Sequence, residues 1–312
     1  MNKQQEQQIA QIMADNIIKA IESGKGNNWL KPWSGGKFAN IISGKAYKSF
    51  NPLMCHFYNL AHGYTSNFFI TVNATFKMAK ASGEHWKIDN PKQYNIVSLS
   101  SFFEKEEEQP NGETKKKKVW FYKAYRVYNI EQIEGWQEKF ADYIAKHSEQ
   151  WNEHQPIEQA EMFVNNYLES EAIVANIGGP RAFYSPGKDV IGMPNIKQFV
   201  SPGEYYSTFL HEIAHSTGHE SRLNRFKPSD KALFGNDTYS KEELIAEFAA
   251  QLLCYDLGIS DSRLIENSEQ YLAGWGKRFK ENPEILFEAA LLAQKAAKYV
   301  TKTVTENQTV TA

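Results

Sequence analysis

The stretch "FLHEIAHSTGHESRLNR", Phe209–Arg225, decides the fold of the second half of this 312-residue chain. It holds His211 and His215 four positions apart with Glu212 after the first, which is the pattern H-E-x-x-H. Side chains four residues apart on a helix share one face, so the two imidazoles can bind one cation. We predict a metal site with His211 and His215 as ligands and Glu212 as the catalytic base. The alternative is a polar helix face with two exposed histidines.

The helix that carries this motif has a predicted start, end and apolar face. Residues 201–204, "SPGE", form an S-x-x-E capping box with proline at the first helical position, and Gly218 is the predicted end. An apolar stripe at helical spacing lies opposite the two histidines. It contains Tyr206, Phe209, Leu210, Ile213 and Thr217.

A third ligand has to come from another segment, because a zinc site normally takes three protein ligands. In the predicted helix "KEELIAEFAAQLLCYDLG", residues 241–258, Glu243 and Glu247 share the side opposite the apolar residues, whereas Glu242 lies nearer the apolar flank. We predict Glu243 as the ligand and Glu247 as the carboxylate that orients a ligand histidine. The swapped assignment, and a purely solvating role for both, stay open.

Two further residues are candidates for a substrate cleft. A histidine in the longer pattern H-E-x-x-H-x-x-G-x-x-H would stand at position 221, which is Ser221 here, so His219 is interpreted as a cleft residue or as an exposed loop histidine. Upstream, "FYSPGKDVIGMP", residues 183–194, is expected to form an edge strand along which an extended peptide can lie. Tyr184 in this strand either donates to a developing oxyanion or is an ordinary packed tyrosine.

The first half of the chain differs in charge from the second. Residues 1–150 carry 20 Lys and Arg against 15 Asp and Glu, a net of +5, and residues 151–312 carry 15 against 22, a net of −7. Aromatic residues alternate with cations in the first half, a mixture typical of single-stranded nucleic-acid binding, although core aromatics with solubilising lysines would look the same. The candidate DNA-binding residues are Trp29, Lys31, Trp33, Lys45, Tyr47, Lys48 and Arg126.

The pattern predicts an α+β fold in two domains, residues 1–150 and 151–312. Helices are expected at 4–22, 51–64, 241–257 and 282–302, a strand that runs into a helix at 68–83, and strands at 93–103 and 119–130. The charge block between the last two, "EKEEEQPNGETKKKK", is interpreted as a hairpin tip with its turn at residues 110–112, and the alternative is a lysine binding patch. The tail at 304–312 is expected to fray.

The sequence also indicates where the protein works. Its two cysteines, Cys55 and Cys254, form no C-x-x-C pair and imply no disulfide framework, which favours the reducing cytosol. No signal core and no apolar run of membrane-spanning length occur, so we expect a cytoplasmic protein with no membrane partner.

Through these segments the whole chain resembles the ArdC-type antirestriction proteins of plasmids and conjugative elements, whose relatives include the N-terminal region of TraC-type plasmid primases. "WLKPW" (Trp29–Trp33) and "SGKAYKSFNPL" (Ser43–Leu53) resemble the N-terminal domain, which is associated with single-stranded DNA binding. "HEIAHSTGHESRLNR" followed by "YSKEELIAEFAAQLL" resembles the C-terminal zincin-like metallopeptidase domain. The stretch "GEHWKIDNPKQ" departs from the glycine-led basic segment of the family, which leaves individual DNA contacts open.

The resemblance implies a zinc-dependent metallopeptidase, or one that uses another divalent metal, within an antirestriction protein of a mobile element that binds single-stranded DNA. The implied protein substrate is unidentified, with a component of a restriction system as the expectation. The rival function is a binding-only protein that shields single-stranded DNA and whose metal site is structural or vestigial. A metal hydrolase that acts on sugar or lipid also remains open, because H-E-x-x-H alone does not exclude it.

Overall fold

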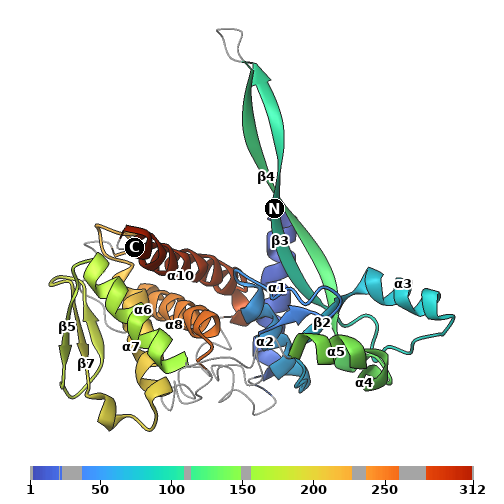
Figure 1. Cartoon of the computed structure of the whole chain (residues 1–312), viewed down its shortest axis with the longest axis horizontal. Helices are drawn as coiled ribbons and strands as arrows, with labels where there is room; N and C mark the ends of the chain where they lie inside the picture. The colour runs from blue at the N-terminus through green and yellow to red at the C-terminus, as the bar shows by residue number, and fades with distance from the viewer. Residues whose placement is uncertain are drawn as a thin grey trace.

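The computed structural model describes residues 3–20, 22, 37–108, 114–148, 156–226, 237–259 and 279–310. It has an α+β architecture in which a helical body carries two small sheets and one long hairpin (Figure 1). Among the described residues, no helix combines the length and the hydropathy that crossing a membrane requires. Cys55 and Cys254 are both free and buried.

The first half contains a four-stranded sheet in the order β1-β2-β4-β3. β1 pairs with β2 in parallel, and the other neighbours are antiparallel. The Thr71 hydroxyl accepts from the Ala74 N–H and so caps α3 directly after β2. The elements of this half are α1 (Lys3–Ala20), β1 (Ala39–Asn40), α2 (Asn51–His62), β2 (Phe68–Thr71), α3 (Val72–Ser82), β3 (Asn95–Glu108), β4 (Thr114–Asn129), α4 (Trp136–Lys139) and α5 (Ala141–Ser148).

Among the described residues, the second half packs four helices beside a three-stranded sheet in the order β5-β7-β6. Its elements are α6 (Pro156–Ser170), β5 (Val174–Ile177), β6 (Phe183–Ser185), β7 (Val190–Met193), α7 (Pro202–Ser216), α8 (Asp237–Leu257) and α10 (Glu284–Val310). The predicted cap of α7 is confirmed, because the Ser201 hydroxyl accepts from the Glu204 N–H at 3.1 Å. The Glu204 carboxylate accepts a hydrogen bond from the N–H of Val200, whereas a capping box would have it accept from the N–H of Ser201.

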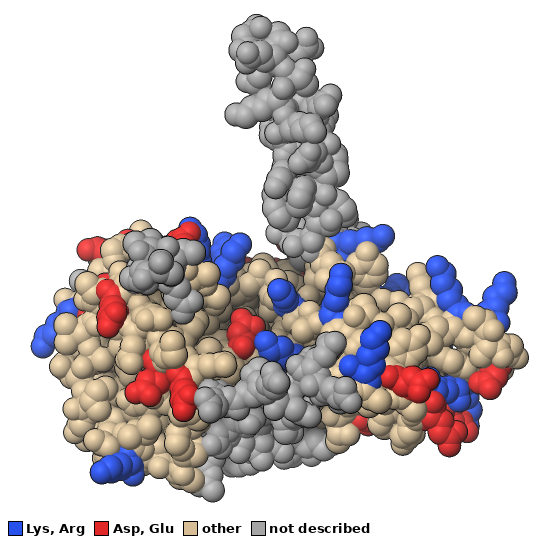
Figure 2. All heavy atoms as spheres, viewed as in Figure 1, with Lys and Arg blue, Asp and Glu red and all other residues tan. Residues whose placement is uncertain are grey.

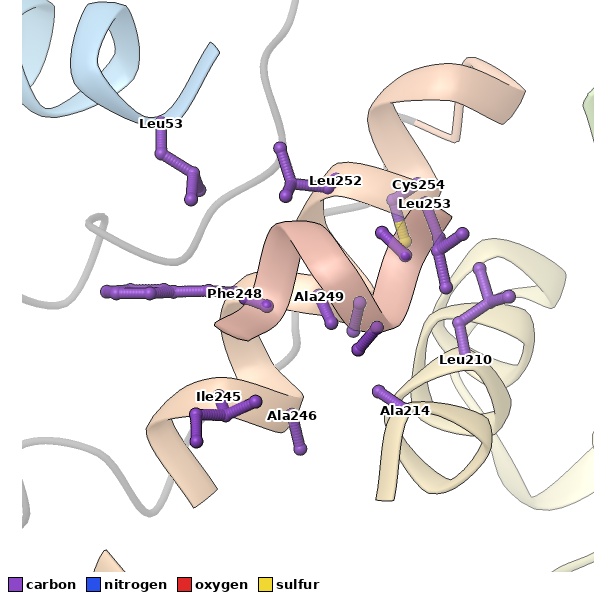
Figure 3. Close-up of a cluster of buried hydrophobic side chains, with 14 of the residues drawn as sticks. Leu53, Leu210, Ala214, Ile245, Ala246, Phe248, Ala249, Leu252, Leu253 and Cys254 are labelled. Atoms are coloured by element: carbon purple, nitrogen blue, oxygen red, sulfur yellow. The ribbon is translucent and has the colours of Figure 1, made fainter. Parts of the chain in front are cut away.

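One hydrophobic cluster extends across both halves of the chain. Leu53 of α2 lies with Phe248 and Leu252 of α8, and Leu210 and Ala214 of α7 pack on the other side of α8 (Figure 3). The ring centroids of Phe57 and Phe248 are 5.8 Å apart, and those of Phe50 and Phe287 are 5.6 Å apart. α8 therefore joins the predicted metal helix to the first half. The predicted domain boundary near residue 150 lies outside the described residues and stays a prediction.

Most predicted elements are confirmed, but several of their ends differ. The single edge strand expected over residues 183–194 was wrong: the segment forms two antiparallel strands, of which β6 is at the edge and β7 is central. β3 and β4 continue to Glu108 and from Thr114, so the charge block forms strands rather than only a tip, and the predicted turn at 110–112 lies outside the described residues. α10 continues to Val310, so the expectation of a frayed tail from residue 304 was wrong. α7 ends at Ser216 with Thr217 as its C-cap, one residue before the predicted Gly218. These ends depend on pairing and packing that local composition does not report.

Candidate metal centre

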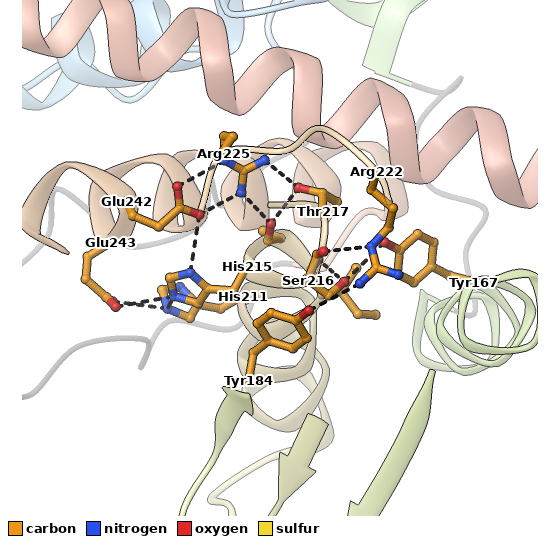
Figure 4. Close-up of polar contacts among 12 residues, drawn as sticks. Tyr167, Tyr184, His211, His215, Ser216, Thr217, Arg222, Arg225, Glu242 and Glu243 are labelled. Carbon is orange, nitrogen blue, oxygen red and sulfur yellow. Dashed lines mark hydrogen bonds and ion pairs between the residues drawn. The ribbon is translucent and has the colours of Figure 1, made fainter. Parts of the chain in front are cut away.

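The side chains of α7 and α8 bring three metal-ligand atoms together. The Nε2 atoms of His211 and His215 lie 3.1 Å apart. The two carboxylate oxygens of Glu243 lie 3.3 Å from Nε2 of His215 and 3.5 Å from Nε2 of His211 (Figure 4). All three side chains are largely buried, with 11–24% of their surface exposed. Among the described residues, these three form the group with metal-ligand spacing.

The other nitrogen of each imidazole faces its own carboxylate. Nδ1 of His211 lies 3.3 Å from Glu247, and Nδ1 of His215 lies 3.5 Å from Glu242. A carboxylate acceptor at Nδ1 favours the Nδ1–H tautomer and leaves the Nε2 lone pair free for a metal. Burial of His215 opposes its protonation, but hydrogen bonds to Glu242 and Glu243 outweigh burial and raise its pKa to about 9.

The donor spacing fits one tetrahedral cation. With zinc–ligand bonds of about 2.0–2.1 Å, the edge of a tetrahedron is about 3.3 Å. The two Nε2 atoms lie 3.1 Å apart, each lies 3.3–3.5 Å from a different oxygen of Glu243, and one ligand atom from each of the three residues lies within 4.8 Å of the others. Two imidazole nitrogens and one carboxylate are also the donor set of an open catalytic zinc site. The residues present therefore fit a divalent metal.

Glu212 lies between the two histidines on α7 and is 7% exposed. Burial raises the pKa of its carboxyl, while the positive charge of the imidazoles and the backbone N–H of Tyr184, which donates to it, act in the opposite direction. The edge strand β6 thus holds the Glu212 carboxylate beside the histidines.

The sequence reasoning missed two contributors to the site, Glu242 and Arg225. The Arg225 guanidinium binds both Glu242 oxygens, at 2.6 and 3.0 Å, and also donates to Thr217 Oγ1 and to the Ala214 carbonyl. Glu242 therefore connects Arg225 to His215 (Figure 4). The sequence could have indicated this role, because Glu242 lies on the apolar flank of α8 and a buried carboxylate requires a cation or a hydrogen-bond donor.

The segment after α7 folds back on that helix. The N–H groups of Arg225 and Phe226 both donate to the Gly218 carbonyl, and Asn224 adopts a left-handed φ of 49°. A Cβ at Gly218 would lie 2.6 Å from the Phe226 ring, so any other residue there would displace that ring. The fold-back directs Arg222 and Arg225 to opposite sides of the C-terminal turn of α7.

Arg222 anchors the second sheet to this turn. Its side chain is 1% exposed, binds Asp189, and donates to the Ser216 carbonyl at 2.7 Å and to the Tyr184 hydroxyl at 3.2 Å (Figure 4). The Tyr184 hydroxyl in turn donates to Asp189 at 2.6 Å. The predicted oxyanion role of the Tyr184 hydroxyl does not fit this engagement. Tyr184 instead contributes through its backbone N–H, which donates to the Glu212 carboxylate beside the two histidines.

His219, the other predicted cleft residue, lies outside the ligand cluster. It is half-buried, and its Nδ1 lies 2.8 Å from the Ser221 hydroxyl.

The predicted DNA-binding residues fall into three groups. Trp29, Lys31 and Trp33 lie outside the described residues. Lys45, Lys48 and Arg126 are exposed, and the Arg126 guanidinium lies 4.8 Å from the Tyr94 ring centroid. Tyr47 is 6% exposed and packs edge-on against Phe69, so stacking of a base on this ring does not fit its burial.

Comparison with known proteins agrees with this architecture in both halves. Residues 158–292 match the family described as zincin-like metallopeptidase, and residues 7–128 match the N-terminal domain of anti-restriction factor ArdC. Two DNA primases TraC of Escherichia coli are 30% and 31% identical over 96% and 92% of this chain, which spans only 20% and 26% of their length. The uncharacterised protein y4eC of Sinorhizobium fredii is 26% identical over 94% of this chain and 91% of its own length.

Solved structures extend the match to the whole chain. The metal-free crystal structure of the antirestriction ArdC protein from plasmid R388 superposes with a TM-score of 0.61 at 30% identity, over 96% of this chain and 98% of that one. A Mn(II)-bound structure of the same protein gives a TM-score of 0.61 at 28% identity. With both domains present in the same order over nearly its full length, the chain belongs to the ArdC-type antirestriction family.

Proposed function

We propose that this protein protects incoming DNA from restriction by combining single-stranded DNA binding with metal-dependent peptide hydrolysis. The observation that carries the hydrolytic part is the convergence of His211, His215 and Glu243 with Glu212 on the same helix as the histidines. The family match supports the antirestriction role.

In this proposal His211, His215 and Glu243 hold the cation, which we propose to be Zn²⁺. Bound there, a divalent cation supplies Lewis acidity to a scissile carbonyl and to the attacking water. Glu247 and Glu242 hold the imidazoles through Nδ1, at 3.3 and 3.5 Å. A Mn(II)-bound crystal structure exists for the ArdC protein from plasmid R388, which supports a divalent cation at this site and leaves another divalent metal as the alternative to Zn²⁺.

Glu212 is the proposed general base. It takes a proton from the attacking water and later delivers it to the leaving amine, which balances the hydrolysis of one peptide bond. The Tyr184 N–H, which donates to Glu212, keeps the carboxylate directed at the reacting atoms. β6 is an edge strand of its sheet, and we propose that an extended substrate peptide pairs along it, with His219 near one end. The proposed substrate is a protein component of a restriction system in the recipient cytoplasm.

The test compares Glu212→Gln with Glu220→Gln, because Glu220 is an exposed glutamate in the same stretch. Glu212→Gln is expected to keep its fold and metal content and to lose cleavage of a peptide library, whereas Glu220→Gln keeps all three. Transfer of DNA into a restricting host then measures protection. If Glu212→Gln protects as well as the parent, antirestriction does not require the peptidase and the binding-only function replaces this proposal.

A further inference from the structure

The helix α3 leaves one of its sides open to solvent, at the end of the molecule far from α7 (Figure 1). Thr75 and Ala79, which are 0% and 9% exposed, form its inner side. Residues that follow one another at spacings of three and four share a side of a helix. The exposed residues with that spacing form the opposite side, which we call the outer face: Asn73, Phe76, Lys77 and Lys80.

Phe76 is an aromatic ring that the packing of α3 leaves in solvent. It is 55% exposed, more than any other aromatic side chain in the described part of the chain. Thr75 and Ala79 already occupy the inner side of α3, so the Phe76 ring does not contribute to the core. An exposed ring of this kind can take an unpaired base on its face.

The outer face carries positive charge only. α3 contains two exposed lysines, Lys77 and Lys80, and no Asp or Glu. Within the described ranges neither lysine forms an ion pair, whereas Lys87, which follows the helix, pairs with Glu134 at 2.9 Å. Glu84, the first acidic residue after α3, lies beyond the C-cap of the helix. The two ammonium groups of the outer face are therefore available to an anion.

Arg126 extends this basic surface toward the sheet. Thr71, the last residue of β2, pairs with Val127, so α3 begins beside the exposed Arg126. Tyr128 lies two residues further along β4 and so on the same face of the sheet as Arg126, and it shares a hydrophobic cluster with Ala79 of α3. Arg126 and α3 are thus on the same side of the sheet. Lys and Arg side chains stand along the upper surface of this end of the molecule (Figure 2).

An exposed ring beside unpaired cations matches the way in which proteins bind single-stranded nucleic acid, with bases stacked on rings and phosphates held by cations. Lys77 follows Phe76 directly and Lys80 lies one helical turn beyond it, so both cations flank the ring. A duplex keeps its bases paired and stacked on one another, so it offers the Phe76 ring no free base.

We infer that the outer face of α3, with Arg126 at its sheet end, is the surface on which this protein binds single-stranded DNA. A base stacks on the Phe76 ring, and Lys77 and Lys80 bind phosphates. The inference rests on the DNA-binding part of the proposed function and names the surface that performs it.

The first experiment tests the ring in the full-length protein, with binding of a fluorescent single-stranded oligonucleotide measured by anisotropy across a salt series. Phe76→Leu keeps an apolar side chain but removes the ring, and it should weaken binding at least about fivefold. The salt slope should stay unchanged, because stacking releases no counterions. Phe76→Tyr keeps the ring and should bind as the parent does. Binding of the matching duplex should not respond to Phe76→Leu.

The second experiment tests the cations with two matched double variants. Lys77→Gln with Lys80→Gln alters the outer face, and Lys295→Gln with Lys298→Gln removes the same charge, at the same spacing, from exposed positions of α10. Each phosphate contact contributes a slope of about 0.7, so the outer-face variant should lower the salt slope by about 1.4 and weaken binding about 25-fold at about 0.1 M salt. The α10 variant should bind within about threefold of the parent.

Equal losses in the two double variants, or parental binding by Phe76→Leu, would overturn the inference. An equal loss of single strand and duplex in Phe76→Leu would also overturn it, because the ring would then not stack on a base. Loss of protection in cells by these variants with DNA binding unchanged would assign the outer face to a protein partner instead. If the parent itself binds no single-stranded DNA, the DNA-binding part of the proposed function fails as well, whereas a parent that binds and variants that bind equally well refute only this surface.

Discussion

The pair of Arg225 and Glu242 is predicted to control metal affinity through His215. Glu242→Gln keeps the shape of the side chain but removes the charge between a guanidinium that is 9% exposed and the imidazole. Losing one partner of a buried ion pair costs about 3–5 kcal/mol. Because Arg225 still donates to Thr217 and Ala214, we expect about 3 kcal/mol, the lower end of that range.

Metal affinity should fall at the same time for a different reason. A neutral amide at Nδ1 of His215 makes the imidazole a weaker ligand, and losses of this kind are about 10–100-fold, or about 1.4–2.7 kcal/mol. Urea unfolding of the metal-free protein measures the first effect, and competition with a chelator measures the second. Glu288→Gln is the control, because Glu288 makes a more exposed pair with Lys241 and should change stability by less than about 1 kcal/mol.

A double variant separates the two effects. Arg225→Met with Glu242→Gln leaves no unpaired guanidinium, and the Thr217 hydroxyl already donates to the Ala214 carbonyl, so most of the stability should return. The metal affinity should stay low, because His215 still lacks its carboxylate. Recovery of affinity together with stability would refute the reasoning, since Glu242 would then act on the metal only through the fold.

Three further outcomes are expected. Glu243→Ala should lose its metal on dialysis while Glu247→Ala retains it with about 10–100-fold lower affinity, and metal analysis showing the reverse would exchange the two roles. Arg222→Met should lower the free energy of unfolding by about 3–5 kcal/mol in a urea titration, because Asp189 loses its buried partner, and a change below about 1 kcal/mol would contradict this. Burial and the nearby Lys19 lower the pKa of His62 from 6.5 to about 4. Between these pH values the folded state binds fewer protons than the unfolded state, so the free energy of unfolding should decrease as the pH is lowered from 6.5 to 4. His62→Gln should reduce that pH dependence, and an unchanged slope would show that other groups cause it.

Local periodicity was sufficient for the parts of the fold and site that lie within single elements. The spacing of His211, Glu212 and His215, together with the Ser201 cap, predicted a helix with both imidazoles on one face, and α7 has that form. Alternation and turn residues predicted the β3–β4 hairpin. These features depend on the 3.6- and 2-residue repeats of the backbone, which any stretch of sequence reveals by itself.

The tertiary structure decided what those elements meet. Because α7 and α8 cross, Glu243 faces the two Nε2 atoms, Glu247 faces Nδ1 of His211 and Glu242 faces Nδ1 of His215. Helical spacing alone had placed Glu242 nearer the apolar side of α8 and so had not identified it as part of the site. Likewise, the buried position of Tyr47 follows from packing against Phe69, a partner distant in the sequence. The sequence predicted which chemistry the site could support, and contacts between segments determined which side chains surround it, because burial and partner choice are set only when separate elements pack.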